Sequence, residues 1–260
     1  MILWTAKLYC LHRHYQKALL PVISKEFGNY FRLMKVCSMQ YNAVIFDMDG
    51  LLIDSEPQWQ EAGRETLEQY GYKLTDEQYN TSTGLRTEEW IEHWFRYFRA
   101  DLRLAPAAVD VVVQKAIEKV GAKSLPFPGI EDVFTFFKER DFRIGLATSS
   151  PMALVDVVIE KLKLHHIFDT LASAGDLPFG KPHPQVYLNC AQQLGCSPLH
   201  CIAFEDSFHG LIAAKAARMK CVVVPAVSGF EHPKWNAADF KLKKLSDFSE
   251  EHLYKLSDKV

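Results

Sequence analysis

The stretch NAVIFDMDGLLIDSE, residues 42–56, decides the fold, because a short apolar run ends in it at two aspartates and a glycine. The run at 42–46 is apolar and is ended by residues that favour turns, which predicts a buried strand. From Glu56 to Gly121 the pattern becomes helical, with Pro57 at an expected first helical position. No strand pattern interrupts this block.

Strands and helices alternate after the block. The segments RIGLATSS, TLASA, CIAFED and CVVVP are expected to be strands, and amphipathic helices of about 10–15 residues separate them. This alternation predicts an α/β fold: a doubly wound, Rossmann-like parallel-sheet core with an inserted all-helical cap domain. The expected boundaries are 1–38 for an N-terminal extension, 57–124 for the cap, and 39–56 with 125–260 for the core.

Charge is spread unevenly along the 260 residues. Residues 1–38 hold six Lys or Arg and one acid, a net of +5, so the remaining 222 residues carry −7 of the total −2. A body of that charge argues against nucleic acid as a partner, because nonspecific binding needs a basic surface. The 1–38 segment is interpreted as a start placed too early, before Met34 or Met39, or as a disordered extension. A targeting peptide and a membrane-surface segment are the less favoured readings.

Cysteine and hydropathy patterns indicate the redox compartment of the protein and whether it inserts into a membrane. None of the six cysteines forms a C-x-x-C pair, and several lie in apolar runs, which is typical of buried thiols in a reducing compartment. No run of about 18 apolar residues occurs, so we expect no stable membrane insertion. These patterns favour a cytoplasmic protein, and we expect a monomer.

Four polar clusters follow predicted strands in chain order. They are Asp47 and Asp49 in FDMDG, Thr148 and Ser149 in LATSS, Lys181 in FGKPHP, and Glu205 with Asp206 in AFEDS. Open α/β sheets bind ligands at the carboxyl ends of their strands, so these clusters are expected to meet. Each cluster alone is weak evidence, because an Asp after a strand is often a helix cap and a Lys near prolines is usually solvated. The four together point to one site.

The chemistry that suits these residues is phosphoryl transfer. Carboxylates repel a phosphate dianion, and a Mg²⁺ held by Asp47 and Asp206 would remove that conflict. Lys181 supplies a second positive charge, while Thr148 and Ser149 can donate hydrogen bonds to phosphate oxygens. One carboxylate is then free to attack phosphorus, and a second, two residues further on, can transfer the proton.

The motifs DMDGLLIDSE, LATSS, GKPHPQVY and FEDSFHG resemble motifs I to IV of the haloacid dehalogenase-like superfamily, in the subgroup with a helical cap after motif I. The resemblance spans roughly residues 41–245. Within the superfamily the chain most resembles bacterial 2-deoxyglucose-6-phosphate and hexitol phosphatases, and it is also similar to β-phosphoglucomutases. The resemblance implies a phosphatase whose partner is a small phosphorylated metabolite, a sugar or sugar-alcohol phosphate.

The resemblance also implies roles for single residues. Asp47 would be the nucleophile that forms an aspartyl phosphate, and Asp49 the general acid/base. Thr148 and Lys181 would bind phosphate. Magnesium would be held by Asp47, Asp206 and the backbone carbonyl of Asp49, with Glu205 beside them or acting through water.

The cap contributes candidates with two interpretations each. STGLRTEEW resembles the family's specificity loop, so Arg86 either contacts a distal substrate group or is a surface arginine at a helix start. The aromatic cluster WIEHWFRYF is interpreted as cap core, and His183 as a loop-packing residue. His209 follows motif IV and is not assigned a role.

Two alternatives to hydrolysis are a sugar phosphomutase and a non-catalytic binding module. The module is disfavoured, because the candidate nucleophile and its partners are all present. β-Phosphoglucomutases carry a cap-linker histidine twelve residues beyond the nucleophile, where this chain has Trp59. Tryptophan has no acceptor nitrogen and does not titrate near neutral pH, which favours hydrolysis over isomerisation.

Overall fold

The computed structural model describes residues 41–82 and 85–257, so the expected 1–38 extension lies outside the described residues. The strands are β1 Ala43–Phe46, β2 Arg143–Thr148, β3 Thr170–Ser173, β4 Cys201–Glu205, β5 Lys220–Val223 and β6 Phe240–Lys241. The helices are α2 Glu56–Gln69, α3 Asp76–Asn80, α4 Thr87–Phe98, α5 Ala105–Lys123, α6 Ile130–Lys138, α7 Met152–Leu162, α8 Gln185–Gln193, α9 Phe208–Ala216 and α10 Glu250–Ser257.

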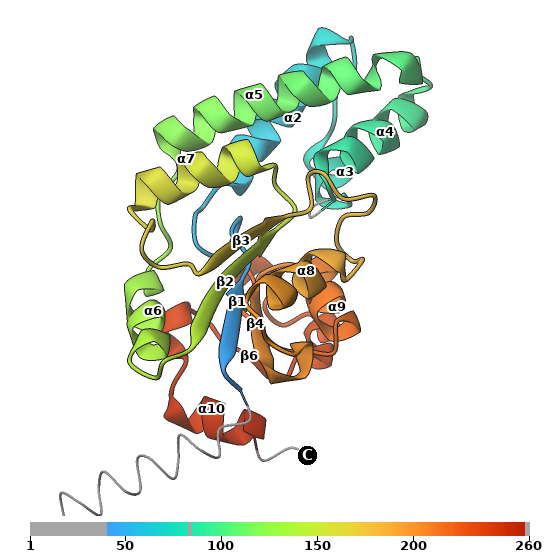
Figure 1. Cartoon of the computed structure of the whole chain (residues 1–260). Helices are drawn as coiled ribbons and strands as arrows, with labels where there is room; N and C mark the ends of the chain where they lie inside the picture. Colours follow the sequence, from blue (N-terminus) through green and yellow to red (C-terminus); the bar gives the residue numbers. More distant parts are fainter. Residues whose placement is uncertain (1–40, 83–84, 258–260) are drawn as a thin grey trace, which may run out of the picture. The chain divides into compact units, whose positions relative to one another are not determined.

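The strands form one six-stranded sheet in the order β3-β2-β1-β4-β5-β6, and every described pairing is parallel (Figure 1). The chain starts at β1 in the middle, moves outward to β3, and returns to the other side of β1 at β4. Such a reversal opens a crevice at the carboxyl ends of β1 and β4, where open α/β sheets bind ligands. The predicted α/β, doubly wound fold is confirmed.

The sheet is buried on both faces, as parallel sheets are. Ala43 and Ile45 of β1 pack into a core formed with α8 and α9. Phe46 points to the other face, where its ring lies 5.1 Å from that of Phe134 of α6. Alternation along a strand therefore places α8 and α9 on one face and α6 on the other (Figure 1).

Helices α2 to α5 form a helical block, residues 56–123, between β1 and α6, at the carboxyl ends of the strands (Figure 1). The aromatic cluster of α4 is core, as predicted: Trp90, Trp94 and Phe95 are buried and pack with residues of α2 and α5. Gly63 of α2 permits this packing, because a Cβ there would lie 2.8 Å from Trp90 Cη2.

Two of these α-helices and one strand were not predicted. Helix α3 has five residues and β6 has two, too few to show a period. Helix α10 is longer, but only Leu253 and Leu256 of its eight residues are buried. No helix among the described residues is both long and apolar enough to cross a bilayer.

Candidate functional site

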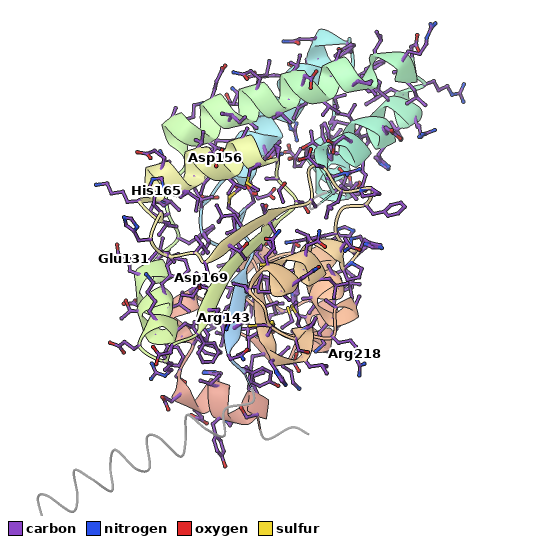
Figure 2. The ribbon with its side chains drawn as sticks, in the orientation of Figure 1. Glu131, Arg143, Asp156, His165, Asp169 and Arg218 are labelled. Carbon is purple, nitrogen blue, oxygen red and sulfur yellow. The ribbon has the colours of Figure 1, made fainter. Side chains whose placement is uncertain are left out.

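The four polar clusters meet at the carboxyl end of the sheet. Asp47 follows β1, Thr148 ends β2, and Glu205 ends β4. Lys181 arrives from the loop between β3 and α8. Figure 2 marks Arg143 at the opposite, amino end of β2. The convergence follows from parallel pairing, because residues that end neighbouring strands lie side by side.

Lys181 lies at the centre of the site, with a side chain that is 3% exposed. Its Nζ donates to Asp47 Oδ1 at 2.6 Å, to Glu205 Oε1 at 2.6 Å, and to the Ala147 carbonyl at 2.9 Å. These three bonds match the three donors of an ammonium. Burial alone would lower the pKa of Lys181, but the charges of Asp47 and Glu205 raise it above its usual value. Lys181 is therefore a fixed cation.

Glu205 is fully buried, and protein donors hold both of its oxygens. Tyr187 of α8 donates to Oε1 at 2.6 Å, beside Lys181. The Ser207 hydroxyl donates to Oε2 at 3.1 Å. Gly210 of α9 lies against this carboxylate, because a Cβ there would be 1.8 Å from Oε1. Glu205 therefore holds Lys181 in place through Oε1.

Asp47 and Asp206 keep oxygens without a protein donor. Asp47 Oδ1 accepts from Lys181, whereas Oδ2 receives no hydrogen bond within 41–82 and 85–257. Asp206 likewise forms neither a hydrogen bond nor an ion pair with any described residue. Gly50, at φ 75°, allows the Asp206 carboxylate to lie close to the backbone, because a Cβ at Gly50 would be 2.1 Å from Asp206 Oδ2. These oxygens remain available for a ligand.

The acidic group is short of positive charge. One oxygen from each of Asp47, Glu205 and Asp206 lies within 4.8 Å of the others. Burial raises the pKa of Asp47 to about 8, because the attraction of Lys181 offsets only part of it and Glu205 and Asp49 add repulsion. Burial also raises the pKa of Asp206 well above its usual value, and Asp47 raises it further. Oxygen ligands with excess negative charge fit a hard divalent cation.

Asp49 accepts hydrogen bonds on both of its carboxylate oxygens. Oδ1 accepts from the Ser55 hydroxyl at 2.6 Å and from Trp59 Nε1 at 3.1 Å. Oδ2 accepts from the Ser150 hydroxyl at 2.7 Å and makes a longer contact of 3.4 Å with Thr148 Oγ1. Ser55, Ser150 and the contact between Trp59 and Asp49 were not predicted from the sequence. Ser55 lies within DMDGLLIDSE and Ser150 within LATSS, and this is the signal that could have identified the two serines.

Thr148 is the last residue of β2, and Ser149 follows it. Thr148 is buried, and its hydroxyl accepts the Ser150 backbone N–H at 3.0 Å. The Ser149 hydroxyl is buried without a hydrogen-bond partner among the described residues. Buried hydroxyls are normally paired, so this orphaned donor is a reason to expect a ligand. Helix α7 begins three residues later, at Met152.

Arg86 is not among the residues that the fold brings together. Its Nη1 donates to the carbonyl of Leu177 and, at 3.4 Å, to that of Ala174. Its Nε lies 3.1 Å from Glu88 Oε2, an ion pair without hydrogen-bond geometry. Arg86 therefore joins the start of α4 to the loop after β3, and both of its carbonyl partners belong to the core.

The two histidines near the motifs differ in setting. His183 is exposed, its ring lies 5.3 Å from that of Phe179, and its Nδ1 accepts from the Gln185 backbone, as expected of a loop-packing residue. His209 is half-buried at the second position of α9.

A cavity of about 830 Å³ lies elsewhere, between the end of α5, α7 and β3. Asp156 and His165, labelled in Figure 2, belong to its wall. None of the convergent polar residues lines this cavity, so it is separate from the candidate site.

The family model for haloacid dehalogenase-like hydrolases matches residues 44–224. Hexitol phosphatase B of Escherichia coli K12 is 40% identical over 215 residues, which are 82% of this chain and 97% of that protein. The fructose-1-phosphate phosphatase YqaB of the same strain is 32% identical, over 71% of this chain and 97% of its own length.

Solved structures share the fold. A β-phosphoglucomutase from Clostridium difficile aligns with a TM-score of 0.74 at 22% identity, over 84% of this chain and 97% of that one. CbbY from Rhodobacter sphaeroides, in complex with phosphate, aligns at 0.72 and 24% identity, over 82% and 99%. The chain therefore belongs to the haloacid dehalogenase-like hydrolase family, as a phosphatase within it.

Proposed function

We propose that the protein is a Mg²⁺-dependent phosphomonoesterase that hydrolyses small sugar or sugar-alcohol phosphates through an aspartyl phosphate on Asp47. One observation carries the proposal: Asp47 offers an oxygen without a donor, Oδ2, while Lys181 holds its other oxygen at 2.6 Å. A nucleophile needs a free electron pair and a fixed orientation, and Asp47 has both.

The surrounding residues suit the two steps of this reaction. Asp47 Oδ2 attacks phosphorus, and the P–O bond to the alcohol breaks as Asp49 gives that oxygen a proton. Water then attacks the aspartyl phosphate and loses a proton to Asp49, which restores both carboxyl groups. The hydroxyls of Thr148 and Ser149, with Lys181, would hold the phosphate oxygens throughout.

The cation would be held by Asp47, Asp206 and the backbone carbonyl of Asp49. Glu205 is the less suitable ligand, because Lys181, Tyr187 and Ser207 already occupy its oxygens. When bound, Mg²⁺ offsets the negative charge between these carboxylates and the phosphate dianion.

We further propose that residues 57–124 act as a cap over the site. The two chain crossings between core and block are bonded to each other: Asp54 N donates to the Leu125 carbonyl at 2.9 Å, and Phe127 N to that of Leu52 at 3.0 Å. A movement of the block must therefore bend both crossings together, near 54–58 and 121–128. Arg86 would lose its carbonyl partners when the block moves away, and it could then meet a substrate.

Hexitol or hexose phosphates are proposed as substrates on the strength of the relatives' activities. The test is phosphate release from a panel of hexitol, hexose and nucleotide phosphates with Mg²⁺, repeated with a chelator. We expect turnover of the first two groups, loss of activity with chelator and recovery on returning Mg²⁺. Turnover that the chelator leaves intact would contradict the metal assignment.

Isomerisation is the alternative outcome. Incubation with β-glucose 1-phosphate and a bisphosphate primer separates the two reactions. We expect free phosphate to form faster than glucose 6-phosphate, and the reverse order would assign the chain to the mutases.

A further inference from the structure

Asp49 is held at four points that come from two different parts of the molecule. Ser55, immediately before the helical block, and Trp59, in the first turn of that block, donate to Oδ1 at 2.6 and 3.1 Å. Ser150 and Thr148, beside the expected phosphate position, face Oδ2 at 2.7 and 3.4 Å. The two oxygens of one carboxyl group therefore have different neighbours and can have different tasks.

The donors on the two oxygens differ in what else they can do. A hydroxyl rotates and can turn from Asp49 to a phosphate oxygen, so Ser150 and Thr148 can release Oδ2 when a substrate binds. An indole N–H is a donor only, and it offers nothing to a carboxyl proton. A proton on Oδ1 would thus lie against the fixed Trp59 N–H and would need Ser55 to turn from donor to acceptor, whereas a proton on Oδ2 meets only hydroxyls that can turn away.

Trp59 is itself fixed. It is half-buried, and its ring packs against the core of the block, together with Tyr70 and Tyr72. Its backbone N–H donates to the Ser55 carbonyl at 3.0 Å, in the first turn of α2. The adjacent Gln58 side chain accepts from Ser124 at 2.9 Å, which ties that turn to the second chain crossing. The Trp59 indole is therefore held by the helical block and would move with it.

We propose that Trp59 is a positioning residue: with Ser55 it anchors Oδ1 of Asp49, so that Oδ2 is the atom that transfers the proton. The inference rests on the proposed function, because it assigns geometry to the same acid/base group. In the first step the Oδ2 proton passes to the ester oxygen as the P–O bond breaks and Asp47 bonds to phosphorus. In the second step Oδ2 takes a proton from the water that attacks phosphorus, the bond between Asp47 and phosphorus breaks, and phosphate leaves. Oδ1 remains an acceptor in both.

The test compares two substrates in the Trp59→Phe variant. A hexitol phosphate has a basic leaving group that needs a proton, whereas p-nitrophenolate leaves without one. We expect kcat/KM for the hexitol phosphate to fall about 10- to 100-fold, the effect of losing one hydrogen bond to a charged group. For p-nitrophenyl phosphate, kcat/KM should stay near the wild-type value, because this constant reports only steps up to departure of the leaving group.

Trp94→Phe is the matched control, because it removes an indole N–H from the same block, bonded to Ser82 at 3.1 Å and not to Asp49. It should leave both substrates unchanged. If Trp59→Phe melts at a lower temperature than Trp94→Phe, Ser55→Ala removes the other Oδ1 donor and decides the question with the same pair of substrates.

Each result has a distinct meaning. An equal loss on both substrates, or no loss on either, would overturn the positioning role while leaving the phosphatase proposal intact. A wild-type protein inactive on both substrates would overturn the proposed function itself.

Discussion

Lys181 binds two carboxylates at once, and the stability of the site depends on this arrangement. Asp47 and Glu205 both lie 2.6 Å from its Nζ, and both are buried. Removing one partner of a buried ionic group leaves uncompensated charge, which costs about 3–5 kcal/mol. The site is therefore sensitive to charge before any substrate binds.

We expect Lys181→Met to abolish activity and to lower the free energy of unfolding by about 3–5 kcal/mol, measured by urea titration. The Glu205→Gln change should restore part of that stability in the double variant, because one of the two stranded charges is then gone. A Lys181→Met protein within about 1 kcal/mol of wild type would show that the ionic group is not balanced as described.

Gly210 shows how an element positions the site. Helix α9 begins close to the end of β4, and the missing side chain at Gly210 leaves room for the Glu205 carboxylate. Alanine normally favours a helix over glycine by about 1 kcal/mol. Here the added Cβ would lie 1.9 Å from Glu205 Cδ, so the overlap must dominate.

Gly210→Ala is expected to displace Glu205, weaken the hold on Lys181, and destabilise the fold by about 1–3 kcal/mol with loss of phosphate release. Gly229→Ala is the control, because no described residue apart from its two chain neighbours has an atom within 4 Å of the added Cβ there. Thermal unfolding of both variants tests the comparison. Equal melting temperatures would show that α9 shifts to accommodate the added Cβ without loss of stability, which contradicts the prediction.

Helices α2 and α5 are joined by a lysine and glutamate network. Glu65 Oε1 lies 2.7 Å from Lys119 and Oε2 lies 2.9 Å from Lys115. Hydrogen bonds from Lys119, then Lys115, lower the pKa of Glu65 to about 2. A carboxyl group whose folded pKa is depressed stabilises the fold above its unfolded pKa, and this contribution is lost as pH falls toward the folded value.

Glu65→Gln should therefore lower the free energy of unfolding at pH 7 by about 0.5–1.5 kcal/mol, a small value because exposed ion pairs are screened. The difference from wild type should shrink as pH falls through about 4. Glu118→Gln in α5 is the control, since Glu118 has no ion pair with any described residue. A Glu65→Gln effect that does not change with pH would exclude the ion pairs as its cause.

Sequence patterns predicted the elements that carry the site, for reasons that particular residues make clear. Asp47, Thr148 and Glu205 each end a parallel strand, and parallel pairing alone brings such positions together. The side chains that hydrogen-bond to the site's carboxylates from helices α8 and α2 were not predictable. Tyr187 reaches Glu205 only because α8 packs over β1, β2 and β3, and Trp59 reaches Asp49 only because the first turn of α2 lies next to it. Both depend on tertiary packing, which leaves no periodic signal in the chain.

At the scale of the whole molecule, the proposed reaction places nucleophile and acid/base two residues apart in the segment that follows β1. Lys181 holds Asp47 from the core, whereas Trp59 holds Asp49 from the block. The core would thus set the nucleophile and the block would set the proton transfer. Both steps of the proposed reaction require Asp47 as the nucleophile, so the proposed mechanism depends on this residue most directly.

The most direct measurement is to locate the phosphoryl group on the enzyme during turnover. The protein is mixed with Mg²⁺ and a hexitol phosphate, quenched in acid, digested and mapped by mass spectrometry. We predict a phosphoryl adduct on the peptide that contains Asp47, and neither adduct nor phosphate release in a folded Asp47→Asn variant. Phosphate release that persists in Asp47→Asn, or an adduct on another residue, would contradict the account.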